Sequence, residues 1–437
     1  MKRVLVITYY WPPSGGSGVQ RWVKFARYLS EYGWAPVIYT PENPELIAVD
    51  DTLGAEIPAG VEVLRRPIRE PYAVYRRLFG GRREGARGGE VNPIHAGGKS
   101  WKQRLALFLR GNLFVPDPRV GWVRPSVRFL RKWLKDHPVD ALVSTGPPHS
   151  MHLIALRLSR ETGIPWVADF RDPWTRMFYF KHLSLTAPAL RRHRRLEREV
   201  LDGASAVVAV SPLVQEEFRS MTETPVELIT NGFDEADFAG PADADDGRFK
   251  LVHTGLFASD GIPDALWRAL AEKVAEDEDF ASKLQIQLVG KTDREVLHSL
   301  EAAGLKPFVT DFGYCSHADA VRRQRAASVL LLPLRKEPEY RATLPGKLFE
   351  YLAADRPILG IGQTDGAMAS VVRASQAGTV CDWEDEQGLR RVIDGWWDRF
   401  RSGEPLRGAE DIGRFSRRRL TESFARLLDR LTENGNK

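Results

Sequence analysis

Residues 345–360 read PGKLFEYLAADRPILG, and this pattern predicts a short helix that runs directly into a buried strand. Lys347 and Glu350 stand three residues apart at the start of the predicted helix, so they share one face. In a parallel α/β sheet, the start of the helix that follows a strand borders the crevice in which ligands bind. A cation and a carboxylate beside helix N–H groups suit a charged phosphate and a sugar hydroxyl. The stretch therefore predicts a binding corner for these two groups.

Strand and helix patterns alternate along nearly the whole chain, which indicates parallel sheets with helical crossovers. Strands are predicted at residues 3–9, 35–39, 141–145, 166–170, 206–210 and 226–230, and again at 250–255, 284–290, 309–313, 329–334 and 357–362. Helices are predicted at residues 19–32, 263–276 and 416–431. The polar, acidic stretch 233–248 is expected to link two domains. The predicted fold class is α/β, with two Rossmann-like doubly wound domains that face a cleft at the carboxyl ends of their sheets.

The bulk composition points to a protein that works inside the cell. With 437 residues the chain is too long for one core. Cys315 and Cys381 cannot build a disulfide framework, and no stretch reaches membrane-spanning length, so we expect a cytoplasmic location. No His/Cys cluster has the spacing of a metal site, and we expect no metal and no cofactor.

The formal net charge of +5 is unevenly spread. Arginines crowd the first half of the chain, at Arg76, Arg77, Arg82, Arg83, Arg87, Arg191, Arg192, Arg194 and Arg195. A basic face suits nucleic acid or an anionic membrane. The sequence carries no nucleic-acid motif, so we expect no nucleic-acid partner. A solvated basic surface and peripheral contact with an anionic membrane are the remaining alternatives.

Residues 78–89 are rich in glycine and arginine and are expected to be mobile. They lead into residues 101–113, where apolar side chains such as Leu105 and Phe108 stand beside basic ones such as Arg104 and Arg110. A basic amphipathic helix of this kind either lies in a membrane interface or packs on its own domain. The first alternative would place the protein on the inner face of the plasma membrane.

Three loops after predicted strands carry candidate ligand-binding groups. In residues 10–20, YWPPSGGSGVQ, Gly15 and Gly16 allow backbone N–H groups to approach a ligand, although a tight structural turn would use the same residues. The loop lacks a Gly-Lys-Ser/Thr sequence, and no acidic residue ends the second strand, which disfavours ATPase and dehydrogenase functions.

In residues 144–152, STGPPHSMH, His149 is expected at the start of a helix, whose N-terminus would lower the imidazole pKa. In residues 168–175, ADFRDPWT, two carboxylates and Arg171 are expected to emerge at the end of a strand. Asp172 precedes a proline, so it is expected to be extended and exposed. A packing histidine and a structural ion pair are the alternatives for these two loops.

Together, the glycine loop, the stretch 168–175 and above all residues 345–360 resemble glycosyltransferase family 4. The resemblance implies a GT-B fold, in which the C-terminal helix crosses back to the N-terminal domain. It implies a retaining glycosyltransferase of the hexosyltransferase type, with a nucleotide-sugar donor as co-substrate. A glycan or lipid-linked acceptor and a role in cell-envelope polysaccharide synthesis follow from the branch that the chain resembles.

The resemblance also implies roles for domains and residues. Residues 1–232 would bind the acceptor, residues 249–410 would bind the donor, and residues 411–437 would pack back on the N-terminal domain. The implied catalytic residues are Lys347, Glu350, His149 and Asp172. The implied donor and phosphate contacts are Gly15, Gly16, Gly255, Tyr314, Arg341, Lys347 and Glu350. The implied acceptor contacts are His149, Arg171 and Asp172.

Two departures from the family pattern concern the donor site. Phe257 and Asp260-Gly261 stand where the family carries an arginine and a lysine–glycine pair that clamp the diphosphate. A diphosphate needs cationic compensation, and Lys347, then Arg341, are the substitutes. Ala342 stands at the first of two glutamate positions, of which Glu350 fits the second, and this disfavours a covalent glycosyl–glutamate intermediate.

Glu337 and Glu339 precede Ala342, but their spacing does not match the missing glutamate. Two other classes of protein stay open at this point. A nucleotide-sugar epimerase of the same architecture would need no acceptor. A catalytically silent sugar-nucleotide-binding or scaffold subunit would suit the missing clamp and Ala342.

Overall fold

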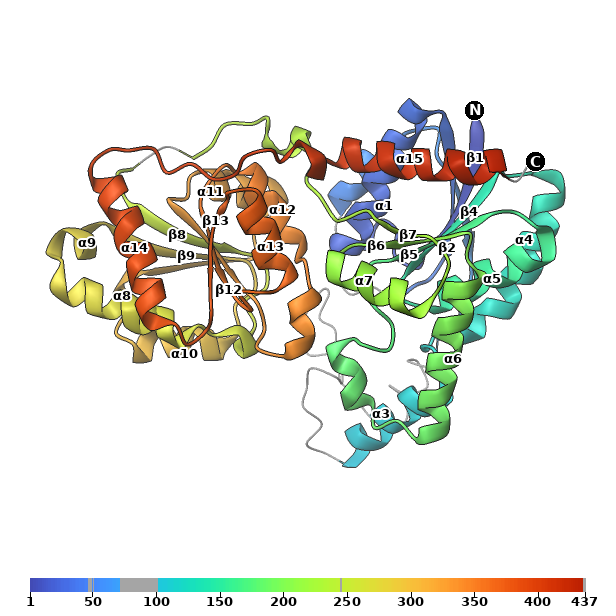
Figure 1. The fold of residues 1–437 in the computed structure, drawn as a ribbon, viewed down its shortest axis with the longest axis horizontal. Helices are drawn as coiled ribbons and strands as arrows, with labels where there is room; N and C mark the ends of the chain where they lie inside the picture. Colours follow the sequence, from blue (N-terminus) through green and yellow to red (C-terminus); the bar gives the residue numbers. More distant parts are fainter. Residues whose placement is uncertain (46–48, 50, 71–100, 244–245, 435–437) are drawn as a thin grey trace. The chain divides into compact units, whose positions relative to one another are not determined.

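The computed structural model describes residues 1–45, 49, 51–70, 101–243 and 246–434. The chain divides into two compact units, unit 1 with Met1–Thr230 and Arg417–Lys437, and unit 2 with Asn231–Ser416 (Figure 1). Each unit is built on one parallel sheet with helical crossovers, so the predicted α/β class is confirmed. Residues 78–89 lie outside the described part of the chain.

The sheet of unit 1 has seven strands in the order β3-β2-β1-β4-β5-β6-β7, all paired in parallel. The strands are β1 Lys2–Ile7, β2 Trp34–Pro41, β3 Glu62–Arg66, β4 Ala141–Gly146, β5 Trp166–Phe170, β6 Ala206–Ala209 and β7 Val226–Leu228. The helices are α1 Ser17–Tyr28, α3 Trp101–Leu113, α4 Val123–Asp136, α5 Ser150–Thr162, α6 Ala187–Gly203, α7 Pro212–Met221 and α15 Arg417–Asn434. The strand order reverses between β1 and β4, which makes their carboxyl ends a ligand-binding position of such sheets.

The core of unit 1 joins the two ends of the chain. Trp22 of α1 and Phe424 of α15 are fully buried, and their rings meet edge to face at 5.3 Å. They belong to the same apolar cluster as Val4 and Val6 of β1. The C-terminal helix therefore completes the hydrophobic core that the first strand begins, as Figure 1 shows by the red α15 beside the blue α1 and β1.

The sheet of unit 2 has six parallel strands in the order β10-β9-β8-β11-β12-β13. The strands are β8 Phe249–Thr254, β9 Leu284–Val289, β10 Val309–Gly313, β11 Val329–Pro333, β12 Ile358–Ile361 and β13 Gly378–Cys381. The helices are α8 Asp264–Glu276, α9 Glu278–Lys283, α10 Arg294–Ala302, α11 His317–Arg325, α12 Gly346–Ala353, α13 Ala367–Ala374 and α14 Glu386–Arg401. Here the order reverses between β8 and β11, and α12 connects β11 to β12.

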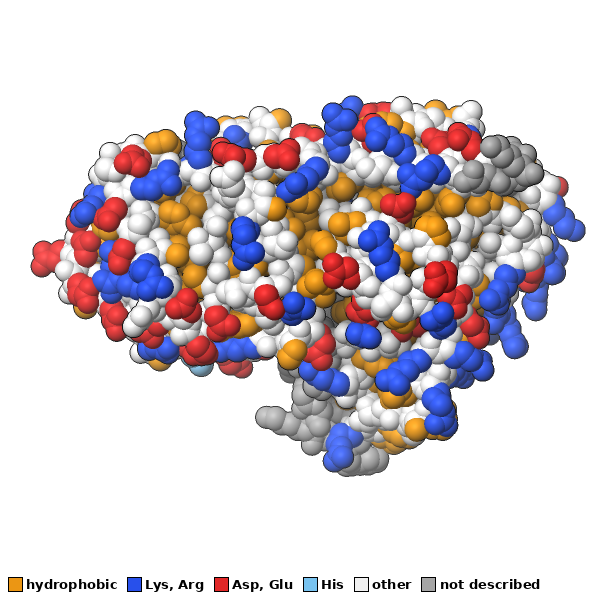
Figure 2. All heavy atoms as spheres, in the orientation of Figure 1, with side chains coloured by type: hydrophobic (Ala, Val, Ile, Leu, Met, Phe, Trp, Pro, Cys, Tyr) orange, Lys and Arg blue, Asp and Glu red, His pale blue; other side chains and the backbone are white. Residues whose placement is uncertain are grey.

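The surfaces of the two units differ in their charge pattern. On the face shown in Figure 2, acidic and basic side chains intermingle over unit 2, whereas basic side chains gather over α6 of unit 1. The arginines of α6 that the sequence singles out, Arg191, Arg192, Arg194 and Arg195, are exposed. These four arginines belong to the surface of unit 1, whereas Arg76, Arg77, Arg82, Arg83 and Arg87 lie outside the described residues.

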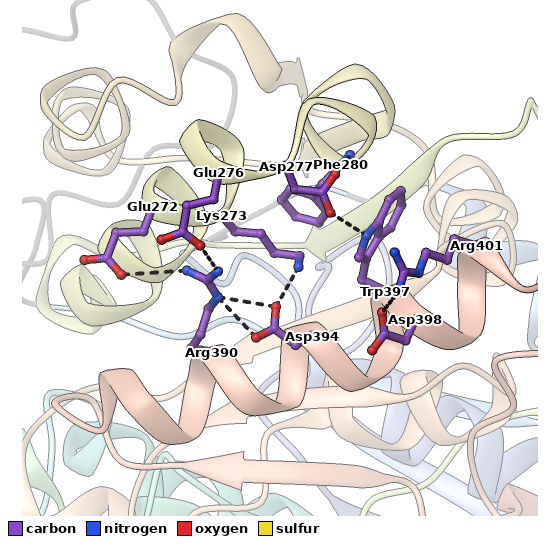
Figure 3. A network of polar contacts seen from close by, with 10 residues as sticks. All are labelled: Glu272, Lys273, Glu276, Asp277, Phe280, Arg390, Asp394, Trp397, Asp398 and Arg401. Atoms are coloured by element: carbon purple, nitrogen blue, oxygen red, sulfur yellow. Dashed lines mark hydrogen bonds and ion pairs between the residues drawn. The ribbon is translucent and has the colours of Figure 1, made fainter.

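A network of charged and aromatic side chains ties α8 to α14 in unit 2 (Figure 3). Lys273 of α8 donates to Asp394 of α14 at 2.6 Å, although the lysine side chain is only 7% exposed. Arg390 pairs with the same aspartate at 3.2 Å and also with Glu276. Trp397 donates to Asp277 at 2.9 Å at the start of α9, and this network fixes α14 against α8 and α9.

Two strands, the end of one helix and the place of the linker differ from the sequence prediction. The edge strands β3 and β13 were not predicted, and in β3 the charged residues hide the strand pattern. The predicted helix 19–32 ends at Tyr28 and continues as a 3₁₀ turn, Leu29–Tyr32. The stretch 233–248 belongs to unit 2, since Phe233 N donates to Phe415 O at 3.1 Å.

Candidate active site

The carboxyl edge of the unit 2 sheet opens between β8 and β11. The two strands pair only as far as Val252 and Leu330. Beyond that point, Nδ1 of the buried His253 ring lies 3.0 Å from the Leu331 carbonyl. This contact takes the place of a backbone hydrogen bond between the two strands. The Tyr351 hydroxyl accepts from Thr254 N at 2.8 Å and donates to the same carbonyl at 3.4 Å. Side chains thus fill the gap where the strands separate.

Lys347 reaches from the first turn of α12 to this opening. Its Nζ donates to the Leu256 carbonyl at 3.2 Å and lies 3.4 Å from His253 Nε2. A Cβ atom on Gly255 would stand 3.0 Å from Nζ, and Gly255 has a left-handed φ of +88°, so only glycine fits without strain. Burial lowers the pKa of Lys347 to about 8, against the raising effect of Glu350. The ammonium is held directly against the loop that follows β8.

Glu350 lies one turn further along α12 and is held by two side chains of α11. Gln324 Nε2 donates to Oε2 at 3.0 Å, and His317 Nε2 lies 3.3 Å from Oε1. Burial raises the pKa of Glu350, but the hydrogen bond and charge of His317, the hydrogen bond from Gln324 and the charge of Lys347 outweigh it and hold the pKa below its ordinary value. The carboxylate is ionised and fixed in place, as an acceptor for hydroxyl groups needs to be.

The other predicted donor contacts are less closely joined to this centre. Tyr314 follows β10 and is 86% exposed, so its ring is open to solvent. Arg341 is half exposed and forms an ion pair with Asp365 at 3.1 Å. No described contact brings Arg341 to Lys347 or Glu350. Of the two cations considered as substitutes for the missing clamp, Lys347 alone is seen beside Gly255 in the described residues.

Two loops of unit 2 contain the positions at which the chain departs from the family pattern. Asp260, which stands where the family carries a lysine, forms an ion pair with Arg335 at 2.9 Å. Arg335 follows β11 and compensates the negative charge of Asp260. Ala342 ends the 3₁₀ turn Pro338–Ala342. Glu337, at the start of this turn, is half buried, and its buried Oε2 accepts no hydrogen bond within the described part of the chain. This oxygen is a candidate acceptor for a donor-sugar hydroxyl.

In unit 1, Arg171 is the residue around which the loops after β1, β4 and β5 meet. Its Nη2 donates to the Pro147 carbonyl, its guanidinium lies 5.9 Å from the centre of the Tyr10 ring, and a Cβ atom on Gly18 would overlap Nη1 at 1.5 Å. Burial lowers the pKa of Arg171, and its buried Nε finds no acceptor among the described residues. The sequence predicted that Arg171 contacts the substrate that accepts the sugar. In the structure, Arg171 joins the three loops to one another.

His149 is the first of two buried histidines beside Gly146. It is 4% exposed, its ring stacks on Trp174 at 4.7 Å, and neither ring nitrogen has a partner within the described residues. His152 Nδ1 lies 2.8 Å from Ser144 Oγ. Burial is the main cause that lowers the pKa of His149 well below its ordinary value, with His152, Arg171 and His193 adding to it. The ring is neutral as expected, but burial, rather than the helix N-terminus, is the cause.

Asp172 differs from the sequence prediction in its exposure. It is half buried, because Trp174 two residues later inserts into the core at 1% exposure and draws the loop onto the domain. Burial raises the pKa of Asp172 to about 6, against the lowering effect of Arg171. No hydrogen bond to its carboxylate is found in the described part of the chain, so the group is open to accept one from a ligand hydroxyl.

Two acidic residues near this edge are structural. Asp169 does not emerge from the strand end as predicted: it is fully buried and pairs with Arg21 at 2.9 Å, and Trp22 and Thr145 also donate to it. Asp117 accepts from Ser150 N at 2.8 Å and so caps the start of α5. Asp117 therefore positions the start of α5, the helix whose N-cap is His149.

The glycine loop ends at the N-terminus of α1. Gly16 has a φ of +106°, which a residue with a side chain adopts only under strain. Its carbonyl accepts from Val19 N and Gln20 N at 3.0 and 3.2 Å, so the loop turns sharply into the helix. Gly15 and Gly16 lie in unit 1, whereas Lys347, Glu350, Gly255, Tyr314 and Arg341 lie in unit 2.

Sequence reasoning missed the side chains that hold the candidate residues. His253, His317 and Gln324 contact Lys347 or Glu350 from other elements. A signal existed for two of them, because His317 and Gln324 stand seven residues apart, two turns along one face of a helix. Within the described residues, no group of three or more His, Cys, Asp or Glu side chains could hold a metal ion, and no helix is long and apolar enough to span a membrane.

Two Rossmann-like sheets, the second with a lysine and a glutamate beside its strand-order reversal and the first completed by the C-terminal helix, define the GT-B class of glycosyltransferases. Residues 86–237 match the family model described as Glycosyltransferase Family 4, and residues 248–398 match the model described as Glycosyl transferases group 1. The chain belongs to the family 4 glycosyltransferases and is an enzyme of that class. A comparison with curated protein sequences gives no significant match.

Solved structures share the fold over nearly the whole chain. Sucrose-phosphate synthase from Thermosynechococcus elongatus superposes with a TM-score of 0.60 at 14% identity, over 99% of each chain. The α,α-trehalose-phosphate synthase from Burkholderia vietnamiensis gives 0.60 at 10% identity, over 99% of this chain and 100% of that one. WaaG, a glycosyltransferase involved in lipopolysaccharide biosynthesis, gives 0.53 at 15% identity, over 97% and 99%. At these identities the likeness concerns the fold alone.

Proposed function

We propose that this glycosyltransferase transfers a sugar, with retention of anomeric configuration, from a nucleotide-sugar donor to a glycan or lipid-linked acceptor in cell-envelope polysaccharide synthesis. The observation that carries the proposal is the placement of the Lys347 ammonium against Gly255 at the opening between β8 and β11. A cation and backbone N–H groups at this position suit a diphosphate. The Glu350 carboxylate, fixed by His317 and Gln324, would accept hydrogen bonds from the ribose hydroxyls.

The chemistry follows from the charges that are available. The bond between the anomeric carbon and the donor phosphate breaks, and Lys347 stabilises the negative charge that develops on the diphosphate. The acceptor oxygen bonds to the anomeric carbon on the same face, and its proton passes to the departing phosphate. Because Ala342 carries no carboxylate, the proposal uses no glycosyl–glutamate intermediate. Neither step requires a metal ion.

The acceptor would be recognised by unit 1. Asp172, ionised above a pKa of about 6, would accept a hydrogen bond from an acceptor hydroxyl. The neutral His149 ring has two unpartnered nitrogens within the described residues and can both donate and accept. Arg171 would position the loops after β1 and β4 around these groups. Backbone contact between the Gly15–Gly16 loop and the donor phosphate remains a prediction.

A lipid-linked acceptor would bring the enzyme to the inner face of the plasma membrane, and α3 is the proposed contact. Leu105 and Phe108 are both 39% exposed and Leu113 is 64% exposed, at spacings that place them along one side of the helix. α3 packs beside α6, which exposes the arginine cluster. Apolar side chains next to arginines suit an anionic bilayer surface. Residues 101–103 lie at the start of α3, and their side chains are outside the described part.

A donor screen tests the proposed reaction. The purified protein and its Glu350→Ala variant are incubated with UDP-, GDP-, ADP- and dTDP-sugars, and thermal stability and nucleotide release are measured. Stabilisation with slow nucleotide release for one donor, lost in the variant, is the expected result. Sugar conversion without nucleotide release would instead point to an epimerase. No response to any donor would point to a non-catalytic subunit.

Sedimentation with liposomes tests the membrane contact separately. We expect binding to vesicles that contain anionic phospholipid and little binding to neutral ones. The double variant Leu105→Ser with Phe108→Ser should lose binding, whereas Leu228→Ser, at an exposed leucine on the edge strand β7, should not. Absence of binding to both vesicle types would remove the membrane from the proposal.

A further inference from the structure

His253 is a buried histidine whose protonation state follows from its contacts. Nδ1 lies 3.0 Å from the Leu331 carbonyl and Nε2 lies 3.3 Å from the Leu256 carbonyl, but a neutral ring has one N–H and can donate to only one of them. Because Nε2 also faces the Lys347 ammonium, which can only donate, Nδ1 carries the proton. Burial and the neighbouring Lys347 charge lower the pKa of His253 well below its ordinary value, so the ring is neutral. Nε2 therefore presents a lone pair. It accepts from Lys347 Nζ at 3.4 Å, and its 3.3 Å approach to the Leu256 carbonyl is not a hydrogen bond.

This tautomer gives Lys347 two fixed acceptors. The ammonium carries three N–H groups, of which one donates to the Leu256 carbonyl at 3.2 Å and one to His253. The third has no partner in the described part of the chain. Two titratable groups face the ammonium within unit 2, His253 from β8 and Glu350 from α12. A carboxylate at position 253 would hold the lysine equally well but would cancel its charge, whereas a neutral imidazole leaves the charge intact.

We propose that His253 is a positioning residue for donor binding: with the Leu256 carbonyl, it holds the Lys347 ammonium against Gly255, so that the third N–H and the full charge meet the donor diphosphate. The proposal rests on the donor site assigned to unit 2. The proposal gives His253, which is buried at the end of β8, a role in donor binding that the exposed residues of the site do not indicate. His253 acts through Lys347 and does not itself touch the donor.

Two substitutions separate positioning from structure. An asparagine amide reaches about as far as Nδ1, so His253→Asn keeps the hydrogen bond to Leu331 but loses the acceptor for Lys347. A glutamine amide reaches about as far as Nε2, so His253→Gln supplies an acceptor to Lys347 and gives up the bond to Leu331. The carbonyl of Leu331 retains Tyr351 as a donor at 3.4 Å in both variants.

Calorimetric titration of the full chain with UDP, GDP, ADP and dTDP provides the measurement, using whichever nucleotide binds most tightly. We expect His253→Asn to weaken binding about tenfold, equivalent to about 1.4 kcal/mol, and His253→Gln to remain within about threefold of the unmodified protein. In a Lys347→Met background the effect of His253→Asn should disappear, because no ammonium is left to position. His298→Asn, at an exposed histidine of α10, is the control and should change nothing.

The outcomes distinguish the inference from the function on which it rests. If the His253→Asn variant binds the nucleotide more tightly than the His253→Gln variant, His253 has a structural role and the inference is wrong. The same holds if His253→Asn weakens nucleotide binding equally in the Lys347→Met background and in the unmodified protein. If Lys347→Met itself leaves nucleotide affinity unchanged, the donor site has been misplaced. If no nucleotide binds the unmodified protein, the proposed function fails before His253 is tested.

Discussion

At the scale of single residues, Lys347 makes donor binding depend on pH. Burial lowers its pKa to about 8 in the free protein, and only the ammonium form offers charge to a diphosphate. The affinity for the nucleoside diphosphate should therefore be constant at neutral pH and fall as the pH rises through 8, by up to about tenfold per pH unit. Titration calorimetry over this range measures the effect. Lys347→Arg should flatten the profile, and a flat profile in the unmodified protein would contradict the assignment.

A second residue-scale prediction concerns Gly18. A Cβ atom there would stand 1.5 Å from Arg171 Nη1, so Gly18→Ala must displace the guanidinium that joins the loops after β1, β4 and β5. Alanine favours the first turn of α1, so the fold should persist. Transfer to the acceptor should fall about 10- to 100-fold through misplacement of Asp172 and His149. Nucleotide affinity should stay unchanged.

Gly121→Ala serves as the control for that variant, since a Cβ atom on Gly121 would meet nothing within 4 Å. Steady-state kinetics with varied acceptor measures both. Equal rates for Gly18→Ala and Gly121→Ala would show that the position of Arg171 does not matter for transfer.

The residues themselves show where sequence reasoning ends. Lys347 and Glu350 could be predicted because they lie in one short motif on one helical face. His253 could not, because its contact with Lys347 joins β8 to α12 across a long sequence separation. Asp172 shows a different cause: the chain direction before a proline was predictable, but the core insertion of Trp174 that half buries the loop was not.

At the scale of elements, the network between α8 and α14 predicts unequal costs for two neighbouring carboxylates (Figure 3). Asp394→Ala leaves the buried Lys273 ammonium without its acidic partner and also removes a partner of Arg390. The free energy of unfolding of unit 2 should fall by about 2 kcal/mol, less than a fully buried pair would lose because Asp394 is 39% exposed.

Glu272→Ala is the matched control, because Glu272 is 59% exposed and lies 3.8 Å from Arg390. It should cost no more than about 0.5 kcal/mol in the same denaturant titration. Equal costs for the two variants would mean that burial of Lys273 does not determine the contribution of the network.

The elements also differ in how far the sequence predicts them. The central strand 166–170 has the predicted bounds, because an apolar run between turn signals defines such a strand well. The edge strand β3 carries Glu62, Arg65 and Arg66, and charge on an exposed edge prevents aggregation while it hides the strand pattern. What fixes β3 is its pairing with β2, which only the folded sheet supplies.

At the scale of the whole molecule, the chain enters unit 1, passes through unit 2 and returns to unit 1 through α15. Phe424 and Leu428 of α15 are fully buried in the cluster that contains Trp22 and Val4. The amphipathic pattern of the last helix was evident in the sequence, but its partners were implied by the family resemblance alone. Unit 1 therefore depends for its core on the last residues of the chain, whereas unit 2 is continuous in sequence.

This topology makes a prediction that separates the two units. Removal of residues 417–437 deletes part of the unit 1 core, so amide hydrogen exchange in β1, β2 and β4 should accelerate strongly while β8, β9 and β11 keep their protection. A bound nucleoside diphosphate should further protect the segments around Gly255 and Lys347 in both the full chain and the shortened one. If the truncation equally exposes unit 2, the two units do not fold independently. If the nucleotide also protects residues 14–18 in the full chain, the Gly15–Gly16 loop takes part in holding the donor. Loss of this protection in the shortened chain would then show that the loop needs a folded unit 1 to do so.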